Sequence, residues 1–260
     1  MRTTTTILAA FRAVAAVAVA ALAVADLAMA QAPAQKPKYT KAEAEALNAL
    51  LTEKDPAAKI AKADAFVQKF ADTQFKSVAY TQAARAAEQI SDGAKVIIYS
   101  DLAIDADPKA YEAMLMEAAE LARSTRENDL DKEEKLTKAE KLARQAMEIA
   151  PTVPKPSAQV TDDQWEEIKK EFVGDAHRDL GMIATVRKKF DVAVAEFKQA
   201  VSIPHDADPA TFIRLAAAYT DNKQPDEALA VLAKMPADPR LAPFIDKEKK
   251  RAEALKATRK

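Results

Sequence analysis

The sequence contains no cysteine, only three glycines and few aromatic residues. Without cysteine the chain can form no disulfide, no thiolate metal site and no thiol nucleophile. So few glycines argue against the turn-rich architectures of β-sandwiches and β-barrels. Alanine, leucine, lysine and glutamate are frequent instead, and these residues are strong helix formers. The composition therefore predicts an all-α protein whose helices are separated by short turns, with proline as the main breaker.

Neither sign of charge dominates the chain. The formal net charge is −1, and loss of residues 1–30 with Arg2, Arg12 and Asp26 would change it to −2. A chain so close to neutral gives no electrostatic basis for binding nucleic acid. Short catalytic and nucleotide-binding motifs, such as H-E-x-x-H, G-x-S-x-G or the Walker A loop, do not occur. We therefore expect no enzymatic activity, no cofactor and no metal.

The first thirty residues have the pattern of a secretory signal peptide. Arg2 supplies a positive charge, residues 13–25 form an uncharged run, and A-M-A at 28–30 provides small residues for cleavage before Gln31. The alternative is a membrane anchor, but a spanning helix needs about 20 apolar residues, more than this run offers. We expect an exported protein, periplasmic or extracellular, with a flexible lead at 31–39 and no membrane segment after cleavage.

A helical repeat is clearest in residues 174–207. Gly181 lies in its first helix, and Ala193, Phe197 and Ala200 follow at a spacing that places them on one face of a second helix. This unit resembles the tetratricopeptide repeat (TPR), a helix–turn–helix of roughly 34 residues. The resemblance implies that Gly181, Ala193 and Ala200 allow a close approach of the two helices. It also implies that the Phe197 ring fills the space between them.

Further copies of the second-helix signature occur on both sides of this unit. One lies 35 residues downstream, and fainter ones lie upstream: Ala228, Leu232 and Met235; Ala139, Ala143 and Ala146; Val96, Ser100 and Ala103; Ala63, Val67 and Phe70. The extra length between copies falls at 126–134 and 151–163, which we interpret as insertions. One helix pair cannot bury its apolar face alone, so such pairs stack. The predicted fold is a right-handed α-solenoid of about five TPR-like helix pairs with a C-terminal capping helix.

The segments of the chain follow from these landmarks. They are a signal peptide at 1–30, a lead at 31–39, degenerate TPR-like repeats at 40–150, a proline-rich loop at 151–163, TPR repeats at 164–236 and a capping helix at 237–260. Thr161 and Gln164 predict a capping box that starts a helix reaching about Arg187. The apolar residues of the capping helix are expected to point inward: Leu241, Phe244, Ile245 and Ala252.

The two histidines offer the only simple candidates for a base or a metal ligand. His177 and His205 lie in different elements of the predicted fold. His177 stands where TPR units often have tryptophan, so a packing role is the simpler interpretation, and a role as base or ligand is the alternative. His205 follows a proline in a turn, where a capping or exposed role is simplest. The paired carboxylates at 133–134 and 166–167 are interpreted as solvated helix faces.

The concave surface of stacked TPR units is formed by their first helices. The resemblance implies that eight residues face it: Asp175, Arg178, Met182, Thr185, Ile213, Arg214, Ala217 and Asp221. Arginine together with methionine and isoleucine suits the binding of an extended segment or a helix. Residues 63–75 also resemble the opening repeats of outer-membrane assembly lipoproteins. We therefore expect a scaffold that binds a protein or peptide partner in the cell envelope, with the oligomeric state left open.

Three alternatives remain at this point. A small ligand could bind between the repeats and the helix around Trp165 and Phe172, or a helical-repeat enzyme could hide an acid–base pair. The C-terminal stretch 246–260 carries seven lysines and arginines against three acids. That stretch could contact anionic lipid, peptidoglycan or an acidic partner, or it could be an ordinary solvated cap.

Overall fold

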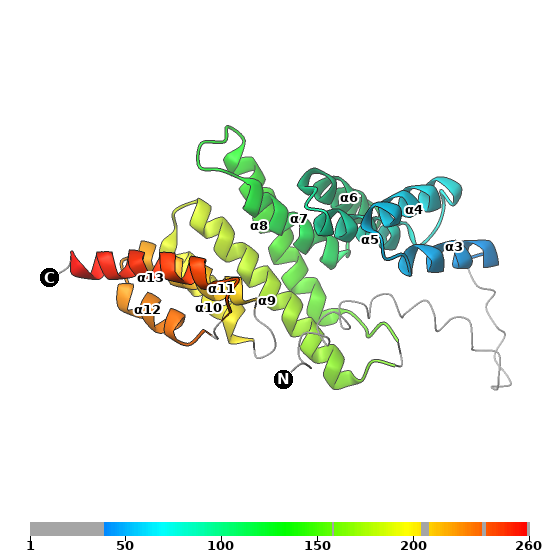
Figure 1. The fold of residues 1–260 in the computed structure, drawn as a ribbon. Helices are drawn as coiled ribbons and strands as arrows, with labels where there is room; N and C mark the ends of the chain where they lie inside the picture. The colour runs from blue at the N-terminus through cyan, green and yellow to red at the C-terminus, as the bar shows by residue number, and fades with distance from the viewer. Residues whose placement is uncertain (1–38, 158, 204–207, 236–237, 259–260) are drawn as a thin grey trace. The chain divides into compact units, whose positions relative to one another are not determined.

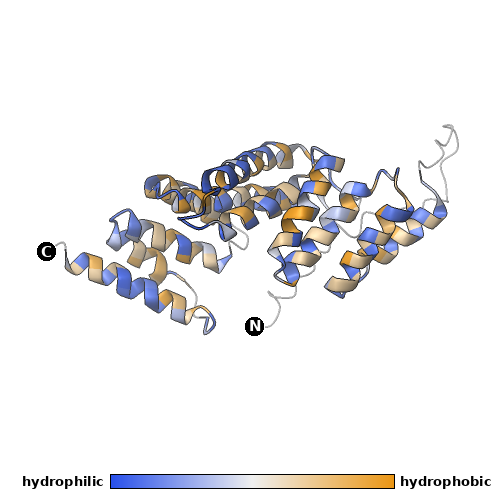
Figure 2. Cartoon of the chain, turned by 90° about the horizontal axis from the view of Figure 1, so that it is seen from above, coloured by the Kyte–Doolittle hydropathy of each residue, from blue (hydrophilic) through white to orange (hydrophobic). Residues whose placement is uncertain are grey.

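A computed structural model describes residues 39–157, 159–203, 208–235 and 238–258 (Figure 1). The expected signal peptide, its cleavage site before Gln31 and His205 lie outside these ranges. The described residues form eleven α-helices and one short 3-10 helix, with no strand among them. Helices in both halves of the chain carry hydrophobic and hydrophilic residues on the same element, as amphipathic helices do (Figure 2). The prediction of an all-α solenoid of stacked helix pairs is confirmed.

The chain divides into two compact units. Within the described ranges, the first comprises residues 39–116 and 153–166, and the second comprises 117–152 and 167–258. Two of the unit boundaries fall inside helices, α7 (Tyr111–Ser124) and α9 (Asp162–Val186), and the third falls between residues 152 and 153, in the loop that precedes α9. Each unit is described separately below.

The first unit contains two successive helix pairs. Its helices are α3 (Lys41–Leu51), α4 (Pro56–Lys69), α5 (Lys76–Gln89) and α6 (Gly93–Ala106). Neighbouring helices pack on each other along the chain, α3 on α4, α4 on α5 and α5 on α6. Larger side chains such as Leu47, Phe66 and Val96 meet the alanine-rich face of α5 in one core. Small alanines on α5 let its neighbours approach closely, which is the packing principle of the predicted repeats.

The beginnings of these helices are fixed by local hydrogen bonds. Thr40 and Glu43 form a capping box at α3: the Glu43 N–H donates to Thr40 Oγ1 at 3.1 Å, and the Thr40 N–H donates to Glu43 Oε2 at 3.4 Å. Tyr39 is the last residue of the expected flexible lead. Its ring nevertheless lies edge-on to Phe75, with centroids 5.4 Å apart. Tyr39 therefore packs against the first unit, although the sequence placed this residue in the lead.

The second unit continues the same construction. It contains the end of α7, most of α9, and the following elements: α8 (Lys132–Ile149), the 3-10 helix η2 (Ala150–Thr152), α10 (Phe190–Ser202), α11 (Pro209–Asp221), α12 (Pro225–Ala233) and α13 (Ala242–Ala257). Helix α10 packs on α11, α11 on α12, and α13 on both α11 and α12. One core joins α9, α10 and α11, and a second joins α11, α12 and α13.

The second-helix signatures occupy the buried positions that the repeat resemblance implied. Ala193, Phe197 and Ala200 of α10 are buried, and so are Ala228 and Leu232 of α12. The upstream copies also bury most of their members: Ala139, Ala143 and Ala146 of α8, Val96, Ser100 and Ala103 of α6, and Ala63 of α4. Residues at spacings of four and three thus predicted the core face of the second helix in each pair, although only α10 has the small–large–small order of Ala193, Phe197 and Ala200.

Three first helices end in the same turn. Ser91, Lys188 and Lys223, which follow α5, α9 and α11, have φ angles of 57°, 59° and 61°. In each turn this residue and the next donate N–H groups back into the last helical turn; for α5, Ser91 donates to Glu88 O at 3.0 Å and Asp92 to Ala87 O at 2.9 Å. The pattern is a Schellman motif, and the residue after the left-handed one caps the second helix. This turn repeats although none of the three residues is glycine.

The two expected insertions are loops, with shifted edges. Helix α8 begins at Lys132, so residues 132–134 are helical and only 125–131 form the first loop. The second loop ends where α9 begins at Asp162, and the predicted capping box forms there: Gln164 N–H donates to Thr161 Oγ1 at 3.2 Å and Thr161 N–H to Gln164 Oε1 at 3.0 Å. Helix α9 then continues for 25 residues, close to the predicted length.

One prediction for the capping helix is wrong. Ile245 and Ala252 of α13 are buried as expected, but Phe244 is 60 % exposed. Glu248 takes the third inward position, and its Oε1 accepts a hydrogen bond of 2.6 Å from Thr220 Oγ1 of α11. Positions 245, 248 and 252 follow one helix face, and residue 244 lies about 100° away from residue 245. A charged side chain with a buried hydrogen-bond partner therefore occupies the expected face in place of the aromatic ring.

Candidate functional site

Helices α9 and α11 carry all eight residues of the predicted groove. Asp175, Arg178, Met182 and Thr185 follow one side of α9 at steps of three and four residues. On α11, Arg214, Ala217 and Asp221 do the same, and Ile213 directly precedes Arg214. All eight side chains are half-buried. That is the exposure expected for a surface that is partly covered by its neighbours and still open to a ligand.

The structure brings only part of this set together. Met182 of α9 packs against a core that includes Leu215 and Ala218 of α11. Ile213 instead packs against the core shared with α12 and α13. Asp221 is also directed to the capping helix, where it forms an ion pair with Arg251. The predicted groove therefore separates into a part between α9 and α11 and a part that α13 partly covers.

A cluster of charges lies where α9 faces the beginning of α11. Arg178 donates from Nε and Nη2 to Asp179 Oδ1 at 3.1 and 3.0 Å, and from Nη1 to Asp175 Oδ1 at 2.5 Å. Two carboxylates therefore occupy three of the five donors of this guanidinium. The repeat resemblance placed Arg178 on the groove as a contact for a partner, but its charge is already matched by two carboxylates of its own helix.

Arg214 is the second cation of the cluster and is held less tightly. Its Nη1 lies 3.6 Å from Asp208 Oδ2, which is an ion-pair distance but too long for a hydrogen bond. Asp208 is the N-cap of α11, and its Oδ1 accepts a hydrogen bond of 3.0 Å from the Ala210 N–H. The helix cap thus also places a carboxylate beside Arg214. Arg214 further interacts electrostatically with Arg178 and Asp179, which joins the charges of both helices.

Asp179 is the member of the cluster that sequence reasoning missed. It is fully buried, and its Oδ2 has no hydrogen-bond partner; Nη1 of Arg214 is buried without one as well. Asp179 follows Ala176 by three residues and precedes Ile183 by four, so it lies on the apolar face of α9. The sequence did contain a signal for this cluster: an aspartate on the apolar face of a predicted helix. A buried charge needs a partner of opposite charge, so such an aspartate indicates a cation nearby.

The electrostatics of the cluster follow from burial and from the ratio of acids to bases. Burial raises the pKa of the Asp179 carboxyl to about 7, and the positive charge of Arg178 only partly opposes this, since Asp175 adds a second negative charge. Burial also lowers the pKa of Arg214, and the neighbouring Arg178 acts in the same direction. The cluster contains two arginines and three aspartates, so its formal charge is −1 when every carboxyl is ionised.

His177 connects the two helices of its own pair. Its Nδ1 lies 2.7 Å from Glu196 Oε2, so α9 and α10 are linked through two half-buried side chains. This contact supports a packing role for His177. Within the described ranges, no group of three or more histidine, aspartate or glutamate side chains is arranged to hold a metal ion. No helix of those same ranges is long and apolar enough to span a membrane.

Trp165 has a structural role in the first unit. It is 8 % exposed, and its indole Nε1–H donates to Val153 O at 2.8 Å. The hydrogen bond to Val153 O fixes the beginning of the loop that precedes α9 to the indole, and Val160 of the same loop is also buried. The Trp165 side chain was the centre of the small-ligand alternative. Its polar atom is already satisfied by the chain itself, and this leaves no free indole donor for a ligand.

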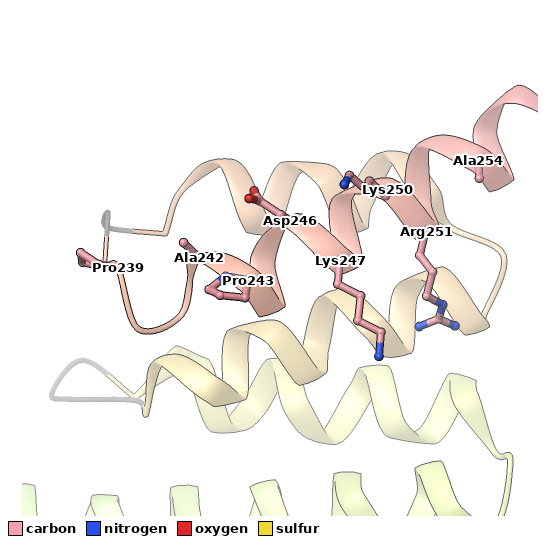
Figure 3. Close-up of a pocket in the computed structure, with 8 residues that line it drawn as sticks. All are labelled: Pro239, Ala242, Pro243, Asp246, Lys247, Lys250, Arg251 and Ala254. Carbon is pink, nitrogen blue, oxygen red and sulfur yellow. The ribbon is translucent and has the colours of Figure 1, made fainter.

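The outer face of α13 has a shallow hollow (Figure 3). It is lined by Pro239, Ala242, Pro243, Asp246, Lys247, Lys250, Arg251 and Ala254. Arg251 also binds Glu248 at 3.0 Å and pairs with Asp221, and Lys256 pairs with Asp226 of α12 at 2.5 Å. Arg251 and Lys256 thus use part of the positive charge of α13 to attach this helix to α11 and α12. Binding of an anionic partner by the remaining lysines stays a prediction.

Comparison with known proteins agrees with this architecture. A crystal structure of a thermophilic TPR protein of Thermus thermophilus aligns with 74 % of this chain and 90 % of its own chain, with a TM-score of 0.52 and 17 % sequence identity. The fold is TPR-like. No protein-family model and no curated protein matches the sequence. The TPR-like fold therefore rests on the helix pairs, their repeated turns and this structural match, and its function has to be argued from the residues themselves.

Proposed function

We propose that this TPR-like protein is a scaffold that binds a protein or peptide partner through the face formed by α9 and α11, and that it catalyses no reaction. The observation that carries the proposal is the charge cluster on these two first helices. A half-buried set of ions is costly, because apolar side chains in the same place are often as stable or more stable. Such a set is better explained by recognition than by stability.

The apolar part of the same face supports the proposal. Met182 is half-buried beside the cluster, and Ala217 lies along α11 on the side that carries Arg214. Methionine adapts its shape to irregular surfaces, and alanine leaves room for a bound chain. Polar groups that fix orientation beside adaptable apolar area are what peptide-binding grooves use.

The setting of the proposed interaction is the cell envelope. Residues 1–30 have the three parts of a signal peptide, and we propose cleavage before Gln31 and export to the periplasm or the exterior. The intact mass of the protein isolated from its native host tests this. A mass that corresponds to residues 31–260 is expected, and the mass of the full chain from the cell envelope fraction would contradict export with cleavage.

Site-specific photo-crosslinking tests the binding face. A photoreactive amino acid replaces Met182 in one variant and Lys198 in the other. Lys198 is the matched control because it is exposed on α10, the second helix of the same pair. Irradiation in the native envelope is expected to join the Met182 variant to one defined polypeptide that the Lys198 variant does not capture. Equal capture by both variants would reject α9 and α11 as the binding face.

A further inference from the structure

We propose that the α9–α11 face recognises a cationic side chain, lysine or arginine, on the segment that it binds. This inference rests on the proposed function and specifies the chemistry of the partner. It differs from the expectation from sequence, in which Arg178 and Arg214 themselves were the charged contacts for the partner. Three observations support it: Arg178 is already paired with two carboxylates of its own helix, the carboxylates of the cluster outnumber its arginines, and one buried carboxylate oxygen has no partner.

The first observation concerns the pairing of the arginines. Arg178 is held between Asp175 and Asp179, and Arg251 of α13 is held between Asp221 and Glu248. Each guanidinium thus has two carboxylates. A partner's carboxylate would have to displace one of these internal acids and would add to their negative charge, which is unfavourable at short range.

The second observation concerns what the face presents to solvent. The Asp208 side chain is 53 % exposed and that of Asp175 is 37 % exposed, whereas the side chain of Arg178 is only 21 % exposed. Arg214 is comparable to Asp175 at 38 %. The rim therefore has two accessible carboxylates against one partly accessible guanidinium. A cation approaching this rim is attracted, and an anion is repelled.

The third observation is the unpartnered oxygen of Asp179. This carboxylate is fully buried, yet only Oδ1 is bound, by Arg178. A buried acceptor without a donor costs free energy that a bound donor would recover. Arg214 Nη1 also lacks a hydrogen bond, but Asp208 Oδ2 lies only 3.6 Å away and a small shift would supply it. In the ionised form of Asp179, Oδ2 therefore remains the acceptor for which an ammonium or guanidinium N–H is the fitting donor.

A set of charged peptides tests the preference directly. Three fluorescent peptides are compared by anisotropy with the purified protein: alternating glycine and lysine, glycine and glutamate, and glycine and glutamine. The lysine peptide is expected to bind about tenfold more tightly than the glutamate peptide, with the glutamine peptide between them. Equal affinities, or a preference for the glutamate peptide, would overturn the inference.

Two double variants with the same change in charge locate the effect. Asp175→Asn with Asp208→Asn removes both rim carboxylates, and asparagine keeps the hydrogen-bonding shape and the helix cap at position 208. The control, Asp191→Asn with Glu227→Gln, removes two exposed acids from the first turns of α10 and α12. The rim variant is expected to lose about fivefold in affinity for the lysine peptide. The affinity of the control variant for the lysine peptide is expected to change by less than about twofold. An equal loss of affinity in both variants would overturn the inference, because it would show that the peptide is attracted to negative charge anywhere on the surface.

A single variant within the core of the cluster gives an independent check. Asp179→Asn removes the unpartnered carboxylate while both rim acids remain, and it is expected to weaken binding of the lysine peptide. Melting temperatures show whether each variant is folded. If crosslinking at Met182 succeeds and the lysine peptide shows no preference, the binding face stands and only the inferred partner chemistry fails. If the lysine peptide binds at the rim and Met182 captures nothing, the proposed cellular partner fails instead.

Discussion

A Cβ atom added at Gly181 would lie 2.6 Å from two carbon atoms of the Phe197 ring. Gly181 is on α9 and Phe197 on α10, so this contact sets how closely the two helices of the pair approach. Real Cβ atoms do not come so near to a ring carbon, and an aromatic ring in a packed core has little room to move. The resemblance to the repeat family implied both roles: Gly181 allows the close approach of the helices, and the Phe197 ring fills the space between them.

The variant Gly181→Ala is therefore expected to destabilise the protein by about 1–3 kcal/mol through overpacking. Gly174→Ala on the same helix is the matched control. Its added Cβ would meet only the Cδ1 tip of Ile203, at 2.7 Å, which a flexible side chain can move. That control should be near neutral, because alanine also has a higher helix propensity than glycine. Urea unfolding measures both, and equal free energies of unfolding for the two variants would contradict the Gly181–Phe197 account.

The left-handed residue after α5 gives a second prediction. Ser91 has a φ of 57°, a conformation that is unfavourable for residues with a Cβ. Ser91→Gly is expected to stabilise the protein by about 0.5–1 kcal/mol, because the strain is removed. The adjacent Asp92→Ala should destabilise by about 1 kcal/mol, since Asp92 Oδ1 accepts a hydrogen bond of 3.1 Å from Lys95 N–H as the cap of α6. The melting temperature is expected to rise for the Ser91 variant and to fall for the Asp92 variant. Shifts of the same sign would contradict the assignment of strain to Ser91 and of helix capping to Asp92.

The stability of the protein should depend on pH through Asp179. The pKa of this carboxyl rises from 3.8 to about 7 on folding, with Asp175, Arg178 and Arg214 as its charged neighbours on α9 and α11. The folded state therefore holds a proton that the unfolded state has released. This contribution is complete below about pH 3.8 and is lost as the pH rises through about 7.

Free energies of unfolding between about pH 5 and about pH 8 measure this effect. The wild type should lose stability as the pH rises, whereas Asp179→Asn, which cannot ionise, should show a flatter profile. The comparison uses the slope only, so a constant change in stability caused by the substitution does not matter. Parallel profiles for the two proteins would mean that Asp179 does not titrate in this range.

The capping helix gives a fourth prediction. Glu248 of α13 accepts from Thr220 of α11 and is 3.0 Å from Arg251 Nη1. Glu248→Ala removes a buried acceptor and leaves Thr220 and Arg251 to find other partners, with an expected cost of about 1–3 kcal/mol. Glu253→Ala on the exposed side of the same helix should cost less than about 0.5 kcal/mol. Faster hydrogen exchange in α13 of the first variant alone is the expected result, and similar exchange in both variants would contradict the anchoring role.

The accuracy of the sequence predictions follows the kind of interaction involved. Helix pairs were predictable because alanine and phenylalanine repeat at spacings of three and four, and burial of these side chains depends mainly on their own helix face. The exposure of Phe244 was predicted wrongly, and the burial of Asp179 was not predicted. Glu248, with its partner Thr220 on another helix, takes an inward position on α13 while Phe244 is exposed, and Asp179 is buried although its residue type indicates exposure.

The same reasoning explains the outcome at the predicted groove. The resemblance to the repeat family implied the helical side on which Arg178 and Arg214 lie. It could not tell whether their charges are available to a partner, because Asp175 and Asp208 pair with them at distances that only the folded chain defines. A residue list from a repeat pattern thus identifies a face, while the charge that this face presents depends on which side chains are already paired.

Hydrogen exchange of the protein with and without its crosslinked partner tests the central claim most directly. Amide protection in α9 from Asp175 to Thr185 and in the first turns of α11 is the predicted result, with exchange in α10 and α12 unchanged. This pattern would place the partner on the face that contains Arg178 and Arg214. Protection confined to α10 and α12, or no protection in the second unit, would contradict the assignment of the binding face.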